Sequence, residues 1–119
     1  MKTHKDLDVW NLAIEIASDV YKITKNFPRN EMFGITSQMR RAAVSIAANI
    51  AEGAARQTKK EFLQFLYIAS GSASELDTII EILRVTTQGL PRELDELQDK
   101  NTRVSRMLKG LNKKLKSSS

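Results

Sequence analysis

The fold of this protein follows from residues 58–91, TKKEFLQFLYIASGSASELDTIIEILRVTTQGLP. Thr58 can cap the amide group three residues further on while the glutamate at that position reaches back, a reciprocal pattern that begins many helices. Gly89 can adopt the left-handed conformation that ends a helix, and Pro91 suits the first position of the next helix, where its missing N–H group costs nothing. The stretch therefore predicts a long helix over about residues 59–88, followed directly by another.

The apolar residues of this helix cover a wide arc of its surface. One seam contains Phe62, Leu66, Ala69, Ala73, Leu76, Ile80 and Leu83, and a second seam beside it contains Phe65, Ile68, Ser72, Ile79 and Ile82. Together the seams span roughly 200°, against about 100° for a half-buried helix. A small bundle could bury its central helices this deeply, or a second copy of the chain could cover the surplus face. We favour self-association, with the interface formed by Phe65, Ile68, Ile79 and Ile82.

Three further segments show helical periodicity and no strand-like alternation. We expect four helices, over about residues 7–26, 34–52, 59–88 and 91–115. Asp6 is the expected N-cap of the first helix, and Gly53 is expected to end the second. Short connections between long helices predict an all-α fold, an antiparallel up-and-down four-helix bundle. At 119 residues, we expect a single domain over residues 1–119 with a frayed tail at 116–119.

The residue types that catalysis and metal binding need are scarce. The chain contains no cysteine and a single histidine, His4, which argues against thiolate sites, multi-histidine metal sites and histidine-based catalysis. The Glu-x-x-His pattern of di-iron bundles and the glycine loops that bind phosphate are also absent. We therefore expect no enzymatic activity, no cofactor and no metal. Without a signal peptide or an apolar stretch of membrane length, we expect a cytoplasmic protein that does not act at a membrane.

The positive charge of the chain is concentrated near its end. Residues 103–119 contain six basic residues and no acidic one, whereas the rest of the chain contains 13 basic and 14 acidic residues. The same helix keeps an apolar heptad whose one polar member, Asn101, is of the kind that fixes helix register. A basic amphipathic helix can bind RNA, DNA, an anionic membrane or an acidic protein, or can be the solvated face of a bundle. In an oligomer, the repeated helix would multiply the positive potential.

Basic side chains therefore predict a nucleic-acid-binding surface. Its candidate members are Arg40, Arg41, Arg56, Lys59, Lys60, Arg103, Arg106, Lys109, Lys113 and Lys114. Most aromatic residues lie on apolar faces where packing explains them, namely Trp10, Tyr21, Phe62 and Phe65. Because Tyr67 alone is expected to point outward, nucleic-acid contacts should be mostly electrostatic and weakly sequence-selective.

The second predicted helix carries a polar face with two possible meanings. Its members at spacings of three and four are Gln38, Arg41, Ser45, Asn49 and Glu52. They could contact phosphate, for which arginine has a bidentate geometry, or they could form a polar layer between helices. We favour a layer of Asn49, Glu52 and Glu75. Glu75 falls within the second apolar seam, where a carboxylate would need a partner such as Arg40 or Arg41.

Two stretches closely resemble the 23S rRNA intervening-sequence protein family, also called four-helix bundle proteins. They are RRAAVSIAANIAEG at residues 40–53 and KKEFLQFLYIASGSASELDT at residues 59–78, and the likeness extends to DLDVW at 6–10, VYKITKNFP at 20–28 and FGITSQMRRA at 33–42. The signature positions here are Arg40, Arg41, Asn49, Glu52, Gly53, Gly71, Ser72 and Glu75. Ala47 and Ala48 stand where the family often has proline and serine, which suggests a straighter second helix. The segment after Gly89 follows no family pattern.

The resemblance implies a four-helix bundle, a homopentamer in several members, and genes often located within insertions in ribosomal RNA genes. It implies no settled biochemical activity. Related bundle proteins are accessory factors of diversity-generating retroelements, where a basic pentamer is thought to hold nucleic acid and a reverse transcriptase. Our leading hypothesis is therefore a non-enzymatic homo-oligomer, a pentamer, that binds ribosomal RNA or another nucleic acid. The rival hypothesis is a protein-interaction scaffold that docks an enzyme or a ribosome-associated partner.

Overall fold

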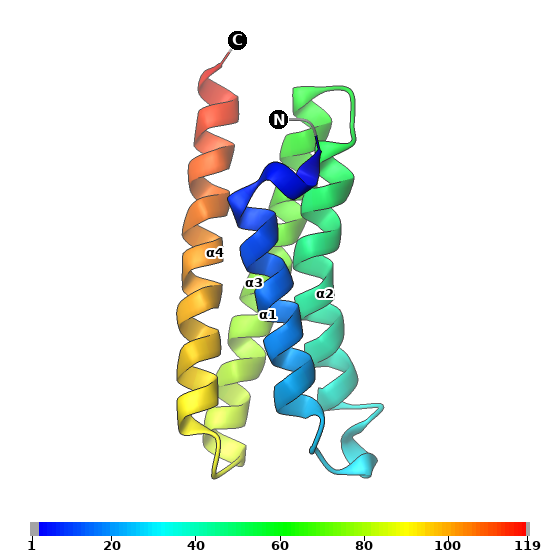
Figure 1. Ribbon diagram of the computed structural model, residues 1–119, viewed down its shortest axis with the longest axis vertical. Helices are drawn as coiled ribbons and strands as arrows, with labels where there is room; N and C mark the ends of the chain where they lie inside the picture. Colours follow the sequence, from blue (N-terminus) through cyan, green and yellow to red (C-terminus); the bar gives the residue numbers. More distant parts are fainter. Residues whose placement is uncertain (1–2, 119) are drawn as a thin grey trace.

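The computed structural model describes residues 3–118 and shows four long helices packed side by side (Figure 1). The helices are α1 (Asp8–Thr24), α2 (Ile35–Ala54), α3 (Lys59–Thr86) and α4 (Pro91–Ser117), and one-turn 3₁₀ helices η1 (His4–Asp6) and η2 (Arg29–Glu31) precede α1 and α2. No strand occurs among the described residues. The predicted all-α four-helix bundle is confirmed.

The helices run alternately up and down, and each packs against two neighbours. Helix α1 contacts α2 and α4, and α3 contacts the same two helices from the other side. The bundle is 49 Å long and 22 by 20 Å across. The α2–α3 turn lies at the same end as the last turn of α4, and the other two connections lie at the opposite end (Figure 1). We call the end with the last turn of α4 the tail end, and the opposite end the loop end.

The boundaries of α3 and the start of α4 follow local sequence signals. The Thr58 hydroxyl oxygen accepts a hydrogen bond from the Glu61 N–H at 3.1 Å, as a helix cap does. The Glu61 carboxylate bonds the same hydroxyl at 2.9 Å, whereas a backbone N–H was the expected donor. Gly89 has a φ of +95°, and Pro91 is the first residue of α4. The predicted turn between these helices is confirmed.

Other helix ends differ from the prediction. Leu7, and not Asp6, is the N-cap of α1, because the Asp6 carboxylate instead closes the preceding 3₁₀ turn by accepting the Thr3 N–H at 3.1 Å. Helix α4 continues to Ser117, so the predicted frayed tail begins too early, and Ser119 lies outside the described residues. A helix continues as long as consecutive backbone hydrogen bonds can form, so the spacing of its apolar residues does not by itself predict its last turn.

Gly53 has a packing role and does not end α2. The helix runs past it to Ala54. A Cβ atom at this position would lie 2.8 Å from the Phe65 Cβ and 2.9 Å from the Phe62 Cδ1, which is shorter than side-chain contacts allow. The glycine therefore lets α3 approach α2 closely at the tail end.

The core is one apolar cluster to which all four helices contribute. Among its fully buried side chains are Ile16, Met39, Leu76 and Leu97. Asn101 is buried within it, and its Nδ2 donates to the Ala73 carbonyl oxygen at 2.9 Å. Such a bond contributes about 1 kcal/mol and can form at one register only. The predicted polar member of the α4 heptad thus sets α4 against α3, which positions the basic second half of α4.

Candidate nucleic-acid interface

Most of the predicted basic residues lie along α4 and at the tail end. The α2–α3 turn and the first turn of α3 carry Arg56, Lys59 and Lys60, and the second half of α4 carries Arg103, Arg106, Lys109, Lys113 and Lys114. The Lys59 ammonium donates to the Ser118 hydroxyl at 2.9 Å and also to the Ser118 carbonyl oxygen. This contact brings the two groups of cations, distant in the sequence, to one end of the bundle.

Arg40 and Arg41 lie apart from this end of the molecule. The Arg40 Nε donates to the Thr24 hydroxyl at 2.9 Å, and its guanidinium lies 4.6 Å from the centroid of the Tyr21 ring. Arg40 therefore ties α2 to the last turn of α1, close to the loop end. Arg41 is exposed on the neighbouring flank. The structure does not bring either arginine together with the tail-end cations.

A surface pocket between α3 and α4 gathers several of the tail-end cations. Its lining consists of Tyr67, Lys109, Asn112, Lys113, Lys116 and Ser117, a set that we call the basic groove. The groove has a volume of about 470 Å³ and no acidic residue in its lining. The Lys116 Nζ lies 5.1 Å from the centroid of the Tyr67 ring. A solvent-facing site of this composition favours an anion that also presents a flat surface.

Asn112 is a candidate site residue that the sequence patterns did not reveal. It is 7% exposed, and its Oδ1 is buried without a hydrogen-bond partner in the described part of the chain. The apolar heptad of α4 contains Leu108, Leu111 and Leu115 but not Asn112, so the heptad pattern did not single this residue out. The available signal was its place about three helical turns after Asn101, which puts both amides on the α4 face that meets α3.

In the loop-end half of the same α3–α4 surface, carboxylates bond to the basic and amide side chains. Arg84 Nη1 lies 2.8 Å from Asp95 and its Nη2 donates to the Gln98 Oε1 at 2.6 Å. Gln98 in turn donates to Asp77 at 3.1 Å and to Glu81 at 2.8 Å. These contacts join α3 to α4, and the carboxylates of this cluster outnumber its one arginine.

Lys100 marks the boundary between the two halves of α4. Its Nζ lies 2.7 Å from an Asp19 carboxylate oxygen and 3.4 Å from a Glu15 one. The hydrogen bond to Asp19 raises the pKa of Lys100 above its ordinary value; attraction to both carboxylates adds to the rise and burial opposes it. Beyond Lys100, none of the basic residues of α4 forms an ion pair with another described residue.

The predicted polar layer is corrected by the structure. Asn49 donates to the Ser45 hydroxyl at 2.9 Å, and the Ser72 hydroxyl donates to the same oxygen at 2.8 Å. A small hydroxyl and amide network thus joins α2 to α3. Glu52 is exposed and lies 3.6 Å from Arg56, and Glu75 is exposed with no ion pair to Arg40 or Arg41. Both carboxylates remain in water because this costs less than burial.

The predicted oligomer interface is partly inside the single chain. Ile79 is 4% exposed and belongs to the core, because α2 covers that side of the second seam. Phe65 is half-buried beneath the guanidinium of Arg56, which lies 4.8 Å from its ring centroid. Ile68 and Ile82 remain on the surface, 51% and 44% exposed. The surface set is therefore smaller than the predicted one.

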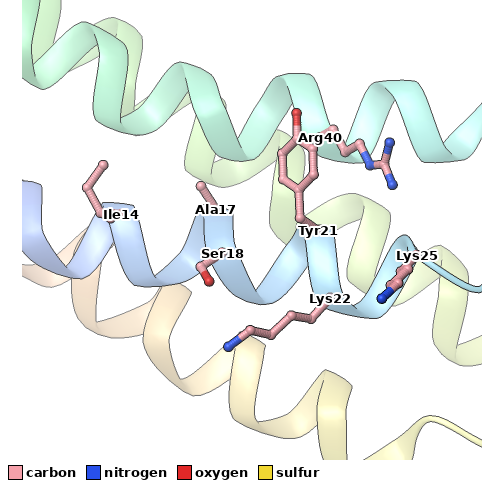
Figure 2. Close-up of a pocket in the computed structure, with 7 residues that line it drawn as sticks. All are labelled: Ile14, Ala17, Ser18, Tyr21, Lys22, Lys25 and Arg40. Carbon is pink, nitrogen blue, oxygen red and sulfur yellow. The ribbon is translucent and has the colours of Figure 1, made fainter.

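A second pocket lies between α1 and α2 and is mostly apolar. Figure 2 shows its lining residues, Ile14, Ala17, Ser18, Tyr21, Lys22, Lys25 and Arg40. Tyr21 was expected to be packed, yet its ring is as exposed as that of Tyr67, 48% in both. The side chains of Ile14 and Ala17 stand along the same side of α1 as Tyr21 (Figure 2). This surface suits an apolar partner better than a phosphate.

Two chemical features are absent from residues 3–118. No group of three or more His, Cys, Asp or Glu side chains within this range is placed to hold a metal ion. None of the described helices is long and apolar enough to cross a membrane.

The fold and the candidate site together indicate the class of this protein, a small all-α bundle with one strongly basic face. Residues 5–110 match the family described as 23S rRNA-intervening sequence protein. The chain belongs to this family. No curated protein matches the chain.

Several chains of solved structures are similar to this protein, and one of them illustrates the shared fold. It is the crystal structure of a protein with unknown function from the S23 ribosomal protein family from Bacteroides thetaiotaomicron VPI-5482. The two chains superimpose with a TM-score of 0.81 at 24% sequence identity, over 88% of this chain and 95% of the other. At this identity the likeness concerns the fold.

Proposed function

We propose that this protein is a non-catalytic, cytoplasmic homo-oligomer that binds RNA or DNA through the basic half of α4 and the adjacent first turn of α3. The observation that carries the proposal is the run of cations from Arg103 to Lys116, which contains no acidic residue and no ion pair among the described residues. Cations that a fold leaves unpaired on one face remain available for phosphates. Ribosomal RNA is the first candidate ligand, as the family resemblance suggests.

The proposal predicts a binding constant that depends steeply on salt. Phosphate contacts release counterions, so the logarithm of the association constant should fall linearly with the logarithm of salt concentration, by about 0.7 for each contact on a single strand. Fluorescence anisotropy with labelled ribosomal RNA fragments across a salt series measures this slope. Failure to bind even at low salt would remove the proposed function.

The oligomeric part of the proposal rests on the outer surface of α3. Ile68 and Ile82 are exposed there, and Gly71 lies between them in the sequence with no atom within 4 Å of where its Cβ would be. A glycine in an exposed helix costs about 1 kcal/mol relative to alanine, and packing within this chain does not explain it. Close approach by another copy would explain both features, and the family resemblance suggests a pentamer.

A pair of matched substitutions tests this surface. Ile68→Glu should lower the mass measured by light scattering, because a carboxylate would have to be buried between copies. Val85→Glu is the matched control, since Val85 is an exposed aliphatic residue elsewhere on α3 and its change should leave the mass intact. A wild-type monomer at micromolar concentration, or equal behaviour of the two variants, would contradict the assembly.

The alternative function is a scaffold for another protein. The apolar pocket between α1 and α2 favours it, because Ile14 and Tyr21 are exposed on the same side of α1 with Ala17 between them (Figure 2), and exposed apolar surface commonly marks protein contacts. Capture of a protein that survives nuclease treatment and is lost on Ile14→Glu would support this alternative. Capture that nuclease abolishes would favour the nucleic-acid function.

A further inference from the structure

We propose that the basic groove contains a subsite for one unstacked base of a single-stranded nucleic acid, in which the base lies on the ring of Tyr67 and its edge meets the amide of Asn112. The inference rests on the proposed function and names the form of nucleic acid that the protein binds. It adds one specific stacking contact to the mostly electrostatic contacts that the sequence predicts.

Tyr67 supplies a flat surface that the fold itself does not need. The residue is 48% exposed on the side of α3 that faces α4. The Lys116 ammonium lies over the ring at 5.1 Å from its centroid, so this π face is covered only by the end of a flexible side chain. When Lys116 turns to a phosphate, a base can take its place over the ring. Aromatic rings stack with every base, because every base has a π face.

Asn112 supplies the polar floor of the groove. Its side chain is more than nine-tenths buried, it lines the pocket, and its Oδ1 has no partner within the described residues. An unsatisfied buried oxygen is costly, and turning the amide so that this oxygen reaches the groove surface would let a ligand donor recover that cost. A half-turn of the amide exchanges oxygen and nitrogen without changing its shape. The amide can therefore offer either an acceptor or a donor to the edge of a base, and bases carry both.

Three lysines place positive charge on both sides of this point. Lys109, Lys113 and Lys116 follow one another at spacings of four and three residues and line the same groove. They lie within two helical turns, or about 10 Å, so they can neutralise the phosphates that flank one nucleotide. A duplex keeps its bases stacked inside and cannot use Tyr67. An acidic peptide could use the lysines, but its carboxylates offer no aromatic face to stack on the ring.

Fluorescence of a base analogue tests the stacking contact. The probe is a short uracil-rich RNA with one 2-aminopurine, whose emission falls when it stacks. Wild-type protein should quench the probe, and Tyr67→Leu should abolish the quenching and weaken binding about tenfold without changing the salt slope. Tyr67→Trp should restore both. Tyr21→Leu is the matched control, because this tyrosine is equally exposed but lies at the α1–α2 pocket.

A second variant separates ligand binding from folding at Asn112. Asn112→Leu has a similar volume and removes the unsatisfied oxygen, so the melting temperature should hold or rise. Affinity for the single strand should nevertheless fall severalfold. Loss of both stability and affinity would assign Asn112 a structural role and overturn its part in the subsite.

The outcomes distinguish the subsite from the proposed function. Steep salt dependence without quenching, unchanged affinity of Tyr67→Leu, or equal binding of a duplex of the same length would refute the subsite and leave electrostatic binding in place. Displacement of the RNA by polyglutamate, with Tyr67→Leu as tight as wild type, would show a general anion surface and also refute it. Absence of any RNA binding at low salt would end both proposals.

Discussion

The two halves of α4 use their positive charges differently. In the first half, Lys100 bonds to Asp19 at 2.7 Å, and the neighbouring Arg84 of α3 bonds to Asp95 at 2.8 Å. In the second half, the cations from residue 103 to residue 116 make no ion pair with any described residue. We call these the paired half and the basic half. The comparison indicates that the paired half holds helices together and that the basic half is kept for a partner.

The energetics support this division. A partly exposed ion pair contributes up to about 1 kcal/mol, whereas like charges three or four residues apart on a helix each cost a few tenths of a kcal/mol. Arg103, Arg106, Lys109 and Lys113 follow one another at such spacings. The negative end of the helix dipole offsets only the cost of the last residues. The basic half therefore lowers stability within the single chain, and binding to an anion would reverse this effect.

Neutralising the basic half should have the largest effect. Lys109→Gln, Lys113→Gln and Lys114→Gln together should weaken single-stranded RNA binding by about 10- to 100-fold at low salt and reduce the salt slope by about 2, as three lost phosphate contacts require. The control carries Lys22→Gln, Lys25→Gln and Arg29→Gln at the loop end, with the same change in net charge. Equal losses in the two proteins, measured by anisotropy, would show that total charge alone drives binding.

Introducing one carboxylate should give the lysines of the basic half an ion-pairing partner, like the one that Lys100 has in the paired half. In Asn112→Asp, the new carboxylate has Lys109 three residues before it and Lys116 four residues after it, so both can pair with it. RNA affinity should fall about fivefold, because two phosphate contacts are weakened, and the melting temperature should also fall, because residue 112 is 7% exposed and burying a carboxylate there costs more than exposed lysines return. A fall in melting temperature with unchanged affinity would mean that the lysines do not reach this position.

Removing a cation from the paired half should change stability and leave binding intact. Lys100→Met should lower the free energy of unfolding by about 1 kcal/mol, because Asp19 and Glu15 lose their shared partner, as measured by urea denaturation. Lys113→Met is the matched control on the basic half, and its stability should be unchanged or higher. RNA affinity should fall in Lys113→Met and stay at the wild-type value in Lys100→Met.

The smallest expected effect is a pH dependence that belongs to the paired half. The folded state raises the pKa of Lys100, so its pairing contributes fully to stability below the unfolded pKa of about 10.4 and is lost as the pH rises through the raised pKa. The stability difference between wild type and Lys100→Met should therefore be constant from neutral pH to about pH 10 and shrink above it. A difference that grows at high pH would contradict this pairing.

Local signals in the sequence predicted the helices and several of their ends. Thr58, Gly89 and Pro91 act through their own backbone or the next turn, so their roles can be read without the rest of the fold. Asn101 could be recognised because a single amide interrupts an apolar heptad. Gly53 was singled out correctly, but its role was misread, because the close approach of Phe65 and Phe62 depends on a helix that comes later in the chain.

The candidate site was predicted less completely. The basic residues of α4 and the outward position of Tyr67 could be expected from charge and periodicity. Ile79 and Glu75 lie on the same seam of α3, and only packing against α2 decides that the first is buried and the second exposed. Asn112 gave a weak signal, because an amide on a lysine-rich helix end looks like ordinary surface.

By itself, the amino-acid sequence determined an all-helical bundle and concentrated positive charge near the end of the chain, because helix periodicity, caps and charge are properties of neighbouring residues. The tertiary structure alone decided which charges are paired. It set the basic half of α4 beside Tyr67 and the start of α3, and it placed the arginines of α2 elsewhere. Such pairing depends on distances of a few ångströms between residues far apart in the chain, which only helix packing fixes.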